Sequence, residues 1–103
     1  MTVAILTAAS TVSLAGGRKG YVPPQGFVPT AEVAQRIAEA VLFPIYGEEN
    51  IKNERPYKVH LEEGVWTVEG TLREQPGHIT VGGVFTINIS KATGEVLYVI
   101  HTR

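Results

Sequence analysis

The sequence predicts an α+β fold in which one main helix packs on a curved, four-stranded antiparallel sheet. Apolar residues recur every four positions over residues 30–43, as in the buried stripe of a helix. Four runs with strand-like composition follow at 57–61, 65–72, 82–90 and 95–101. A chain of 103 residues supports one hydrophobic core, so the helix and the sheet must share it.

The ends of the predicted helix carry start and stop signals. Thr30 is a favourable N-cap, and Glu32 lies in the first turn, where the helix dipole favours a carboxylate. Pro44 is expected to end the helix, because proline lacks the amide hydrogen that the next turn needs and restricts Phe43 before it. The polar stretch 48–56 is expected to form a loop or a short second helical turn.

The strand runs are separated by turn signals. Glu62-Glu63-Gly64 predicts a hairpin between the first two runs, and Lys91–Gly94 predicts a turn between the last two. Gly82-Gly83 is expected to mark a bulge or a close backbone approach. Alternation in 82–90 predicts a strand buried on one face. The run 95–101 is apolar on both faces, which predicts a central strand or a covered outer face.

The segment before the helix divides in two. Residues 1–15 are uncharged and too short in their apolar run to cross a bilayer, so they predict either a secretory signal peptide or an extra strand, with no stable membrane insertion. A signal peptide would make the protein periplasmic; otherwise we expect it to be cytoplasmic. Residues 16–29 are rich in Gly and Pro and predict an extended segment whose aromatic residues are candidates for packing on the domain, which comprises 30–103.

Composition argues against several functions. The net charge of -1, with both signs scattered, gives no electrostatic footprint for nucleic acid, and the absence of Cys excludes thiolate chemistry. The three His lie on different segments without metal-ligand spacing, and no nucleophile or phosphate-binding motif is present. We therefore predict no catalytic residues, no metal and no cofactor. Glu69 is the one carboxylate weighed as a general base, although a solvated outer-face residue is the favoured interpretation.

Several segments in combination resemble one protein family. They are helix 34–43 running into Pro44-Ile45-Tyr46-Gly47, then 55–59, 65–72, 82–87 and 93–97. Together, across about 30–103, they resemble the small bacterial immunity proteins with a nuclear-transport-factor-2-like fold. The resemblance implies a cystatin-like cone that binds and neutralises a cognate toxin delivered by a contact-dependent or type VI secretion system. It implies no particular contact residues.

Acidic and aromatic residues are the candidates for toxin contact, because acidic loops beside exposed aromatics suit the occlusion of a basic cleft. Trp66 is more simply explained as core, whereas Tyr46 could lie at a rim. The candidates are Tyr46, Glu48, Glu49, Glu54, Glu62, Glu63 and Trp66.

Two other classes compete with this interpretation. A PepSY-like exported, protease-inhibitory or cell-envelope module also places one helix on a small sheet and ends in a Thr-Gly-Glu-Val-Leu hairpin, but here Asn88, Ser90 and Lys91 occupy the region where such domains usually keep an acidic residue. A ligand-binding or enzymatic cone would need a closed cavity lined by Trp66, Phe85 and a buried carboxylate. Homodimerisation through an open sheet face or edge is compatible with all three classes.

Overall fold

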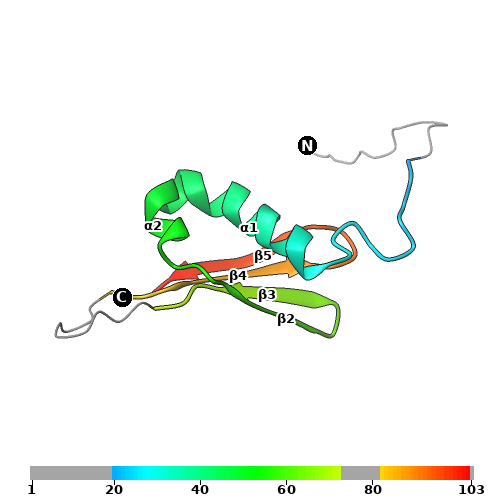
Figure 1. Cartoon of the computed structure of the whole chain (residues 1–103). Coiled ribbons are helices and arrows are strands. Elements are labelled where there is room, and N and C mark those ends of the chain that lie inside the picture. The colour runs from blue at the N-terminus through cyan, green and yellow to red at the C-terminus, as the bar shows by residue number, and fades with distance from the viewer. Residues whose placement is uncertain (1–19, 73–81, 103) are drawn as a thin grey trace, which may run out of the picture.

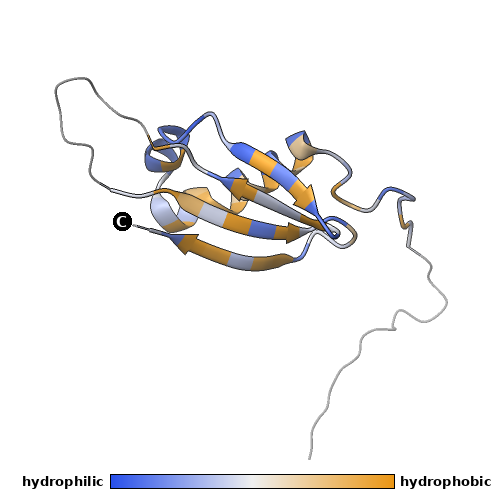
Figure 2. Cartoon of the chain, turned by 90° about the horizontal axis from the view of Figure 1, so that it is seen from below, coloured by the Kyte–Doolittle hydropathy of each residue, from blue (hydrophilic) through white to orange (hydrophobic). Residues whose placement is uncertain are grey.

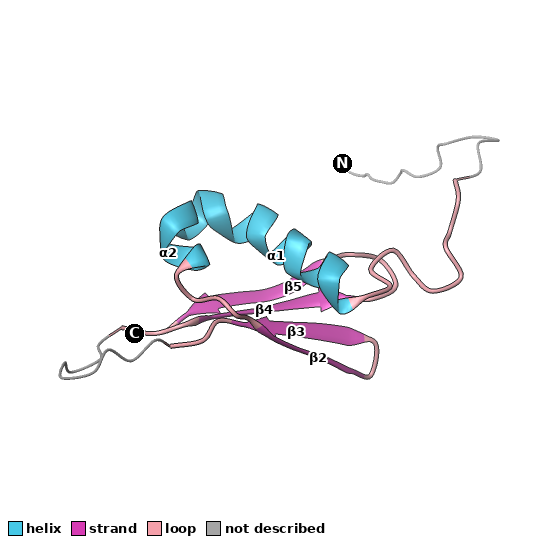
Figure 3. Ribbon diagram, in the orientation of Figure 1, coloured by secondary structure: helices cyan, strands magenta, loops and turns pink. Residues whose placement is uncertain are grey.

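The computed structural model describes residues 20–72 and 82–102. Its elements are α1 (Ala31–Tyr46), α2 (Glu48–Lys52), β2 (Lys58–Glu62), β3 (Val65–Glu69), β4 (Phe85–Ser90) and β5 (Val96–His101). The strands form one antiparallel sheet in the order β2-β3-β4-β5, and both helices lie over the same face of it (Figures 1 and 3). The predicted α+β fold is confirmed, and the polar stretch after α1 forms the short second helix.

Helix α1 starts as predicted but runs three residues further than the sequence suggested. The Thr30 side chain accepts a hydrogen bond from the Val33 amide at 3.3 Å. The expectation that Pro44 ends the helix is wrong, because α1 continues through it to Tyr46. Proline so close to the C-terminus removes only one late intrahelical bond. Gly47, with φ at 97°, ends the helix and donates its amide to the Phe43 carbonyl at 2.8 Å.

The core lies between α1 and the inner face of the sheet. Alternate residues of β3 and β4 point toward the helix, so Phe85, Ile87 and Ile89 are fully buried, as the alternation in this run predicted. The buried hydrophobic residues are Val28, Ala34, Ala38, Leu42, Ile51, Trp66, Val68, Phe85, Ile87 and Ile89.

Strand β5 lies at an edge of the sheet, which corrects the expectation of a central strand. Its apolar residues on both faces leave large side chains on the surface, with Tyr98 50 % exposed and Leu97 48 % exposed. Within the described residues no strand pairs with its outer edge and no segment covers its outer face. An apolar pattern on both faces therefore did not distinguish a central strand from an exposed edge.

The end of the Gly/Pro-rich segment is docked on the domain. The Phe27 amide donates to the Ala92 carbonyl at 3.1 Å, and the Val28 amide donates to Lys91 at 3.0 Å. Val28 rather than an aromatic residue enters the core: Tyr21 is 75 % exposed and Phe27 is 50 % exposed. The expectation that the aromatics of this segment pack on the domain is therefore wrong for these two. Residues 1–15, with the signal-peptide or strand prediction, lie outside the described residues.

The double glycine allows two backbones to approach closely. A Cβ at Gly83 would overlap the backbone of Thr102, and Gly82 has φ of 105°. The predicted close approach is confirmed. The regular pairing of β4 starts only at Phe85, later than the predicted residue 82, although the Thr102 amide still donates to Val84 at 3.0 Å.

Candidate functional site

A pocket of about 370 Å³ opens at the end of the domain where α2 meets the ends of the sheet. We call it the mouth pocket. Helix α2 stands over the end at which β5 finishes and β2 begins (Figure 1). Residues from both helices, from the loop after α2 and from the ends of three strands meet there. The lining residues are Tyr46, Asn50, Asn53, Glu54, Thr71, Leu72, Gly82, Gly83 and His101.

The buried carboxylate of Glu54 forms the floor of the mouth pocket. One carboxylate oxygen accepts the Phe85 amide at 2.9 Å, and the other lies 2.7 Å from His101 Nε2. His101 Nδ1 in turn lies 2.9 Å from the Thr102 carbonyl, and the ring of Tyr46 lies 5.1 Å from the imidazole. The tautomer of His101 sets which ring nitrogen donates in these contacts. Glu54 thus ties the loop after α2 to β4 and β5.

This arrangement anchors the loop after α2 to the sheet. Both oxygens of the Glu54 carboxylate are engaged within the protein. Among the described residues, no buried side-chain polar atom lacks a hydrogen-bond partner. The same part of the chain contains no cluster of three or more metal-ligating side chains. The buried polar groups in the described part of the structure are therefore satisfied within the protein.

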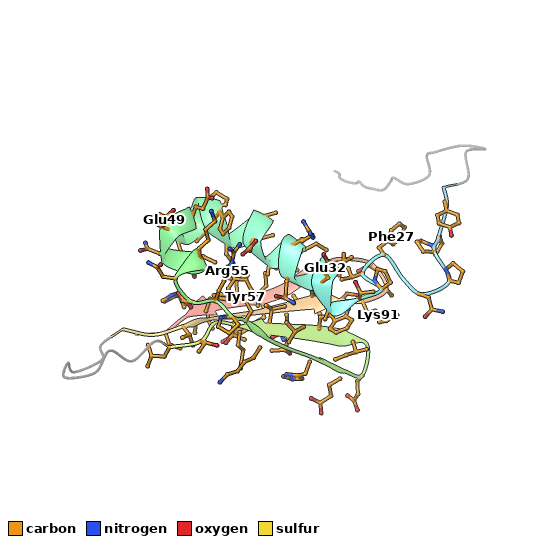
Figure 4. All side chains as sticks on the ribbon, viewed as in Figure 1. Phe27, Glu32, Glu49, Arg55, Tyr57 and Lys91 are labelled. Atoms are coloured by element: carbon orange, nitrogen blue, oxygen red, sulfur yellow. The ribbon has the colours of Figure 1, made fainter. Side chains whose placement is uncertain are left out.

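Three of the predicted contact residues gather beside the mouth pocket. Tyr46 is half-buried and lines it, while Glu48 and Glu49 are exposed in the first turn of α2 (Glu49 is labelled in Figure 4). The Glu48 carboxylate lies 2.6 Å from Lys52 Nζ. This end of the domain presents an acidic helix start next to a hollow.

Two predicted contact residues are interior. Trp66 and Glu54 are each only 8 % exposed, which corrects their assignment to a contact surface. Trp66 alternates with Val68 on the face of β3 that meets α1, and its indole nitrogen donates to the Val28 carbonyl at 2.7 Å. Its interpretation as a core residue is confirmed.

The remaining acidic candidates lie elsewhere. Glu62 ends β2 and Glu63 lies in the hairpin turn, at the opposite end of the sheet from α2 (Figure 1). The predicted acidic cluster is therefore divided between two ends of the molecule. The sequence could not show this separation. Strand β2 carries the chain from one end of the sheet to the other, so acidic residues before and after it lie far apart.

A second polar constellation lies on the side of α1. The Glu39 carboxylate accepts from Arg55 Nε at 3.0 Å and from the Tyr57 hydroxyl at 2.5 Å (Arg55 and Tyr57 are labelled in Figure 4). Burial raises the pKa of Glu39, but the hydrogen bonds from Tyr57 and Arg55 outweigh it, so the net pKa is lowered. Burial and the bond to Glu39 raise the pKa of Tyr57 to about 12. These groups line a groove of about 610 Å³ and bind one another.

Sequence reasoning missed both constellations. Glu54 and His101 are 47 positions apart, and Glu39 and Tyr57 are 18 apart, so no local motif joins them. Glu69, the carboxylate weighed as a base, pairs across the sheet with Lys58 and with Thr86 and does not face the core. The buried carboxylate is Glu54 instead. His78 lies outside the described residues.

The fold and the site together define a small α+β domain with an acidic, hollowed end, and comparison with known proteins identifies its family. Residues 33–103 match the family model described as NTF2 fold immunity protein. The chain belongs to this family, whose members are generally non-enzymatic and act in neutralising toxins. The PepSY-like alternative receives no support from this match. Within the described residues, no helix has the length and apolar character needed to cross a membrane.

Two relatives come from Escherichia coli strain K12. The uncharacterized protein YhhH is 30 % identical over 85 residues, which is 82 % of this chain and 65 % of that protein. The uncharacterized protein YbbC is 36 % identical over 76 residues, covering 74 % of this chain and 60 % of that protein. The chain thus spans less than two thirds of the length of either relative. No solved structure matches the chain.

Proposed function

We propose that this protein protects its cell by binding a cognate bacterial toxin one-to-one and covering the active site of the toxin. The observation that carries the proposal is the family match over residues 33–103. It is consistent with the described part of the site, where no buried side-chain polar atom lacks a hydrogen-bond partner.

The toxin-facing surface in this proposal is the end of the domain that carries α2. Glu48 and Glu49 place negative charge at an exposed helix start, and the mouth pocket beside them has the half-buried ring of Tyr46 on its wall. A basic loop around a toxin active site would find charge complementarity there, and a side chain of that loop would enter the pocket. The proposed contact surface is therefore the acidic start of α2 together with the mouth pocket beside it.

Delivery and compartment form part of the same proposal. The cognate toxin is a contact-dependent or type VI secreted effector. It acts in the periplasm if residues 1–15 are a signal peptide, and in the cytoplasm otherwise. Mass spectrometry of the mature N-terminus tests the compartment separately from the binding.

Co-purification tests the binding. The tagged protein is isolated from its own cells, the partner is identified, and the toxicity of that partner is measured with and without this chain. We expect a stoichiometric partner that is toxic alone and loses its activity on binding. A stoichiometric partner that stays active in the complex, or a protease as the bound species, would refute neutralisation by occlusion.

A further inference from the structure

The free edge of β2 carries two charges of opposite sign. Strand β2 stands at one end of the strand order, and no described strand pairs with its outer edge. Lys58 opens the strand and Glu62 closes it; both are exposed, and neither forms an ion pair within the described residues. They share one face with His60 between them, and the upper edge strand in Figure 2 shows this alternation of hydrophilic and hydrophobic residues. The strand is therefore basic at its start and acidic at its end.

The backbone groups that face this edge belong to Val59 and Leu61. The Gly70 amide donates to the Phe85 carbonyl on β4 at 3.0 Å. Successive residues of a strand direct their backbone groups to opposite sides, so Glu69 and every second residue before it in β3 face β2. Their partners on β2 are Lys58, His60 and Glu62. The two residues between these partners, Val59 and Leu61, therefore present their amides and carbonyls to the open side.

Helix α1 leaves this edge accessible near both ends of the strand. The Leu61 side chain lies on the face that meets α1, because its cross-strand partner is the core residue Trp66, and yet it is 44 % exposed. At the other end, the groove of about 610 Å³ beside α1 extends to Tyr57, the residue before β2. A partner strand can therefore approach the edge at either end.

We propose that the occupant of this edge is β2 of a second copy of the same chain, paired antiparallel with His60 on the two-fold axis. In this register Val59 of one copy lies opposite Leu61 of the other, so the outward backbone groups of both copies meet as hydrogen-bonded pairs. Lys58 of one copy lies opposite Glu62 of the other on the exposed face of the sheet. The two-fold axis forms each of these pairs twice.

The charge pattern favours this partner and this direction. Charges on an edge strand commonly prevent pairing with another chain. Antiparallel self-pairing instead sets every Lys58 against a Glu62, whereas a parallel pairing in register would set each of them against its own kind. The same two side chains that oppose pairing with other strands thus become complementary when the partner is a second copy.

The proposed dimer does not rest on the proposed toxin, because it uses only this chain. No residue that lines the mouth pocket belongs to β2, and the acidic start of α2 lies outside this strand as well. Each copy therefore keeps its own proposed toxin surface, and binding stays at one toxin for each chain.

Charge reversal tests the two ion pairs. Sedimentation velocity of the full chain over a concentration series should show a monomer-dimer equilibrium. Lys58→Glu and Glu62→Lys each place like charges opposite one another twice, and each should raise the dimer dissociation constant about tenfold or more. Glu95→Lys changes the net charge as Glu62→Lys does, at an exposed position next to the opposite edge strand, and should leave the dimer intact. A chain that stays monomeric throughout the series, or equal weakening by Glu95→Lys, would overturn the proposal.

Mixing the two variants separates charge pairing from misfolding. In a heterodimer of Lys58→Glu with Glu62→Lys, one copy carries two carboxylates on the strand and the other carries two ammonium groups. Every acidic side chain then faces a basic one, so the equimolar mixture should associate about as tightly as the unmodified chain. Misfolded variants would not rescue one another. A mixture no tighter than either variant alone would contradict the antiparallel register.

Amide hydrogen exchange on the unmodified chain tests the edge itself. The amides of Val59 and Leu61 should gain protection as the concentration rises, whereas that of His60, already directed at β3, should change little. Protection that is independent of concentration would assign the edge to a segment of the same chain, and protection only with added toxin would assign it to the toxin. Either result would overturn the proposal.

Discussion

At the scale of single residues, Gly70 leaves the space that the Glu54 side chain occupies. A Cβ on Gly70 would overlap Glu54 atoms, and Gly70 itself is buried. Glu54 cannot move away without losing its bonds to the Phe85 amide and to His101. The absence of a side chain at this position thus allows the buried anchor to form.

We expect Gly70→Ala to lower the free energy of unfolding by about 1 to 3 kcal/mol, because overpacking at a rigid site forces backbone and side-chain shifts. Chemical denaturation measures the effect. Gly20→Ala is the control, since nothing lies within 4 Å of a Cβ built there. Equal free energies of unfolding for the two variants would mean that a side chain at Gly70 does not strain its contact with Glu54.

The lowered pKa of Glu39 predicts a contribution to stability that is lost in acid. Because the hydrogen bonds from Tyr57 and Arg55 lower its pKa below the ordinary 4.5, the ionised carboxylate favours the folded state. This stabilisation is present above the ordinary pKa and is lost as the pH falls through the lower, folded-state value.

Glu39→Gln should therefore reduce stability at neutral pH and flatten the loss of stability in acid, as measured by denaturation over a pH series. Glu32→Gln is the matched control, because the Glu32 side chain is 73 % exposed and pairs only with Arg36 on the helix surface. A pH profile that is unchanged by Glu39→Gln would contradict the assignment.

At the scale of elements, the last residues before α1 act as part of the domain. Val28 is fully buried, its amide bonds to the β4–β5 turn, and its carbonyl accepts the Trp66 indole. The docked backbone fixes the approach of the chain to the Thr30 cap and closes the core at the end opposite the mouth pocket.

Val28→Ala should cost about 2 kcal/mol of stability, through lost burial and the cavity left behind. Val22→Ala removes the same atoms from a side chain that is 73 % exposed, and should change stability little. Thermal and chemical unfolding of the pair compare them directly. A small effect at Val28 would mean that the segment is not anchored in solution.

At the scale of the whole molecule, the two acidic ends are separate surfaces. Glu48 and Glu49 flank the mouth pocket on α2, whereas Glu62 and Glu63 lie at the far hairpin. A single flat interface would not use both, so the proposed function assigns binding to the α2 end.

Reversing the charge of Glu48 and Glu49 to Lys should weaken toxin binding roughly tenfold, mainly through a slower association rate. The same reversal at Glu62 and Glu63 is the control and should leave affinity nearly unchanged. Surface plasmon resonance with the co-purified toxin gives both rates, and circular dichroism verifies that α2 survives the loss of the Glu48 pair with Lys52. A larger effect at the hairpin would move the interface to that end.

The local elements and the family could be predicted from the sequence. The Thr30 cap, the four-residue apolar spacing of α1, the alternation of Phe85, Ile87 and Ile89 and the turn glycines act over a few residues, so they can be read from neighbours in the chain. The prediction failed at Pro44, because a proline so close to the end of a helix removes only one late intrahelical hydrogen bond.

The strand order, the edge position of β5 and the contacts of Glu54, Glu39 and Trp66 became visible only in the folded chain. The physical reason is that these features join residues far apart in the chain. Whether a carboxylate is exposed or buried depends on which distant segment folds over it, and an apolar strand reads the same at the centre of a sheet as at its edge.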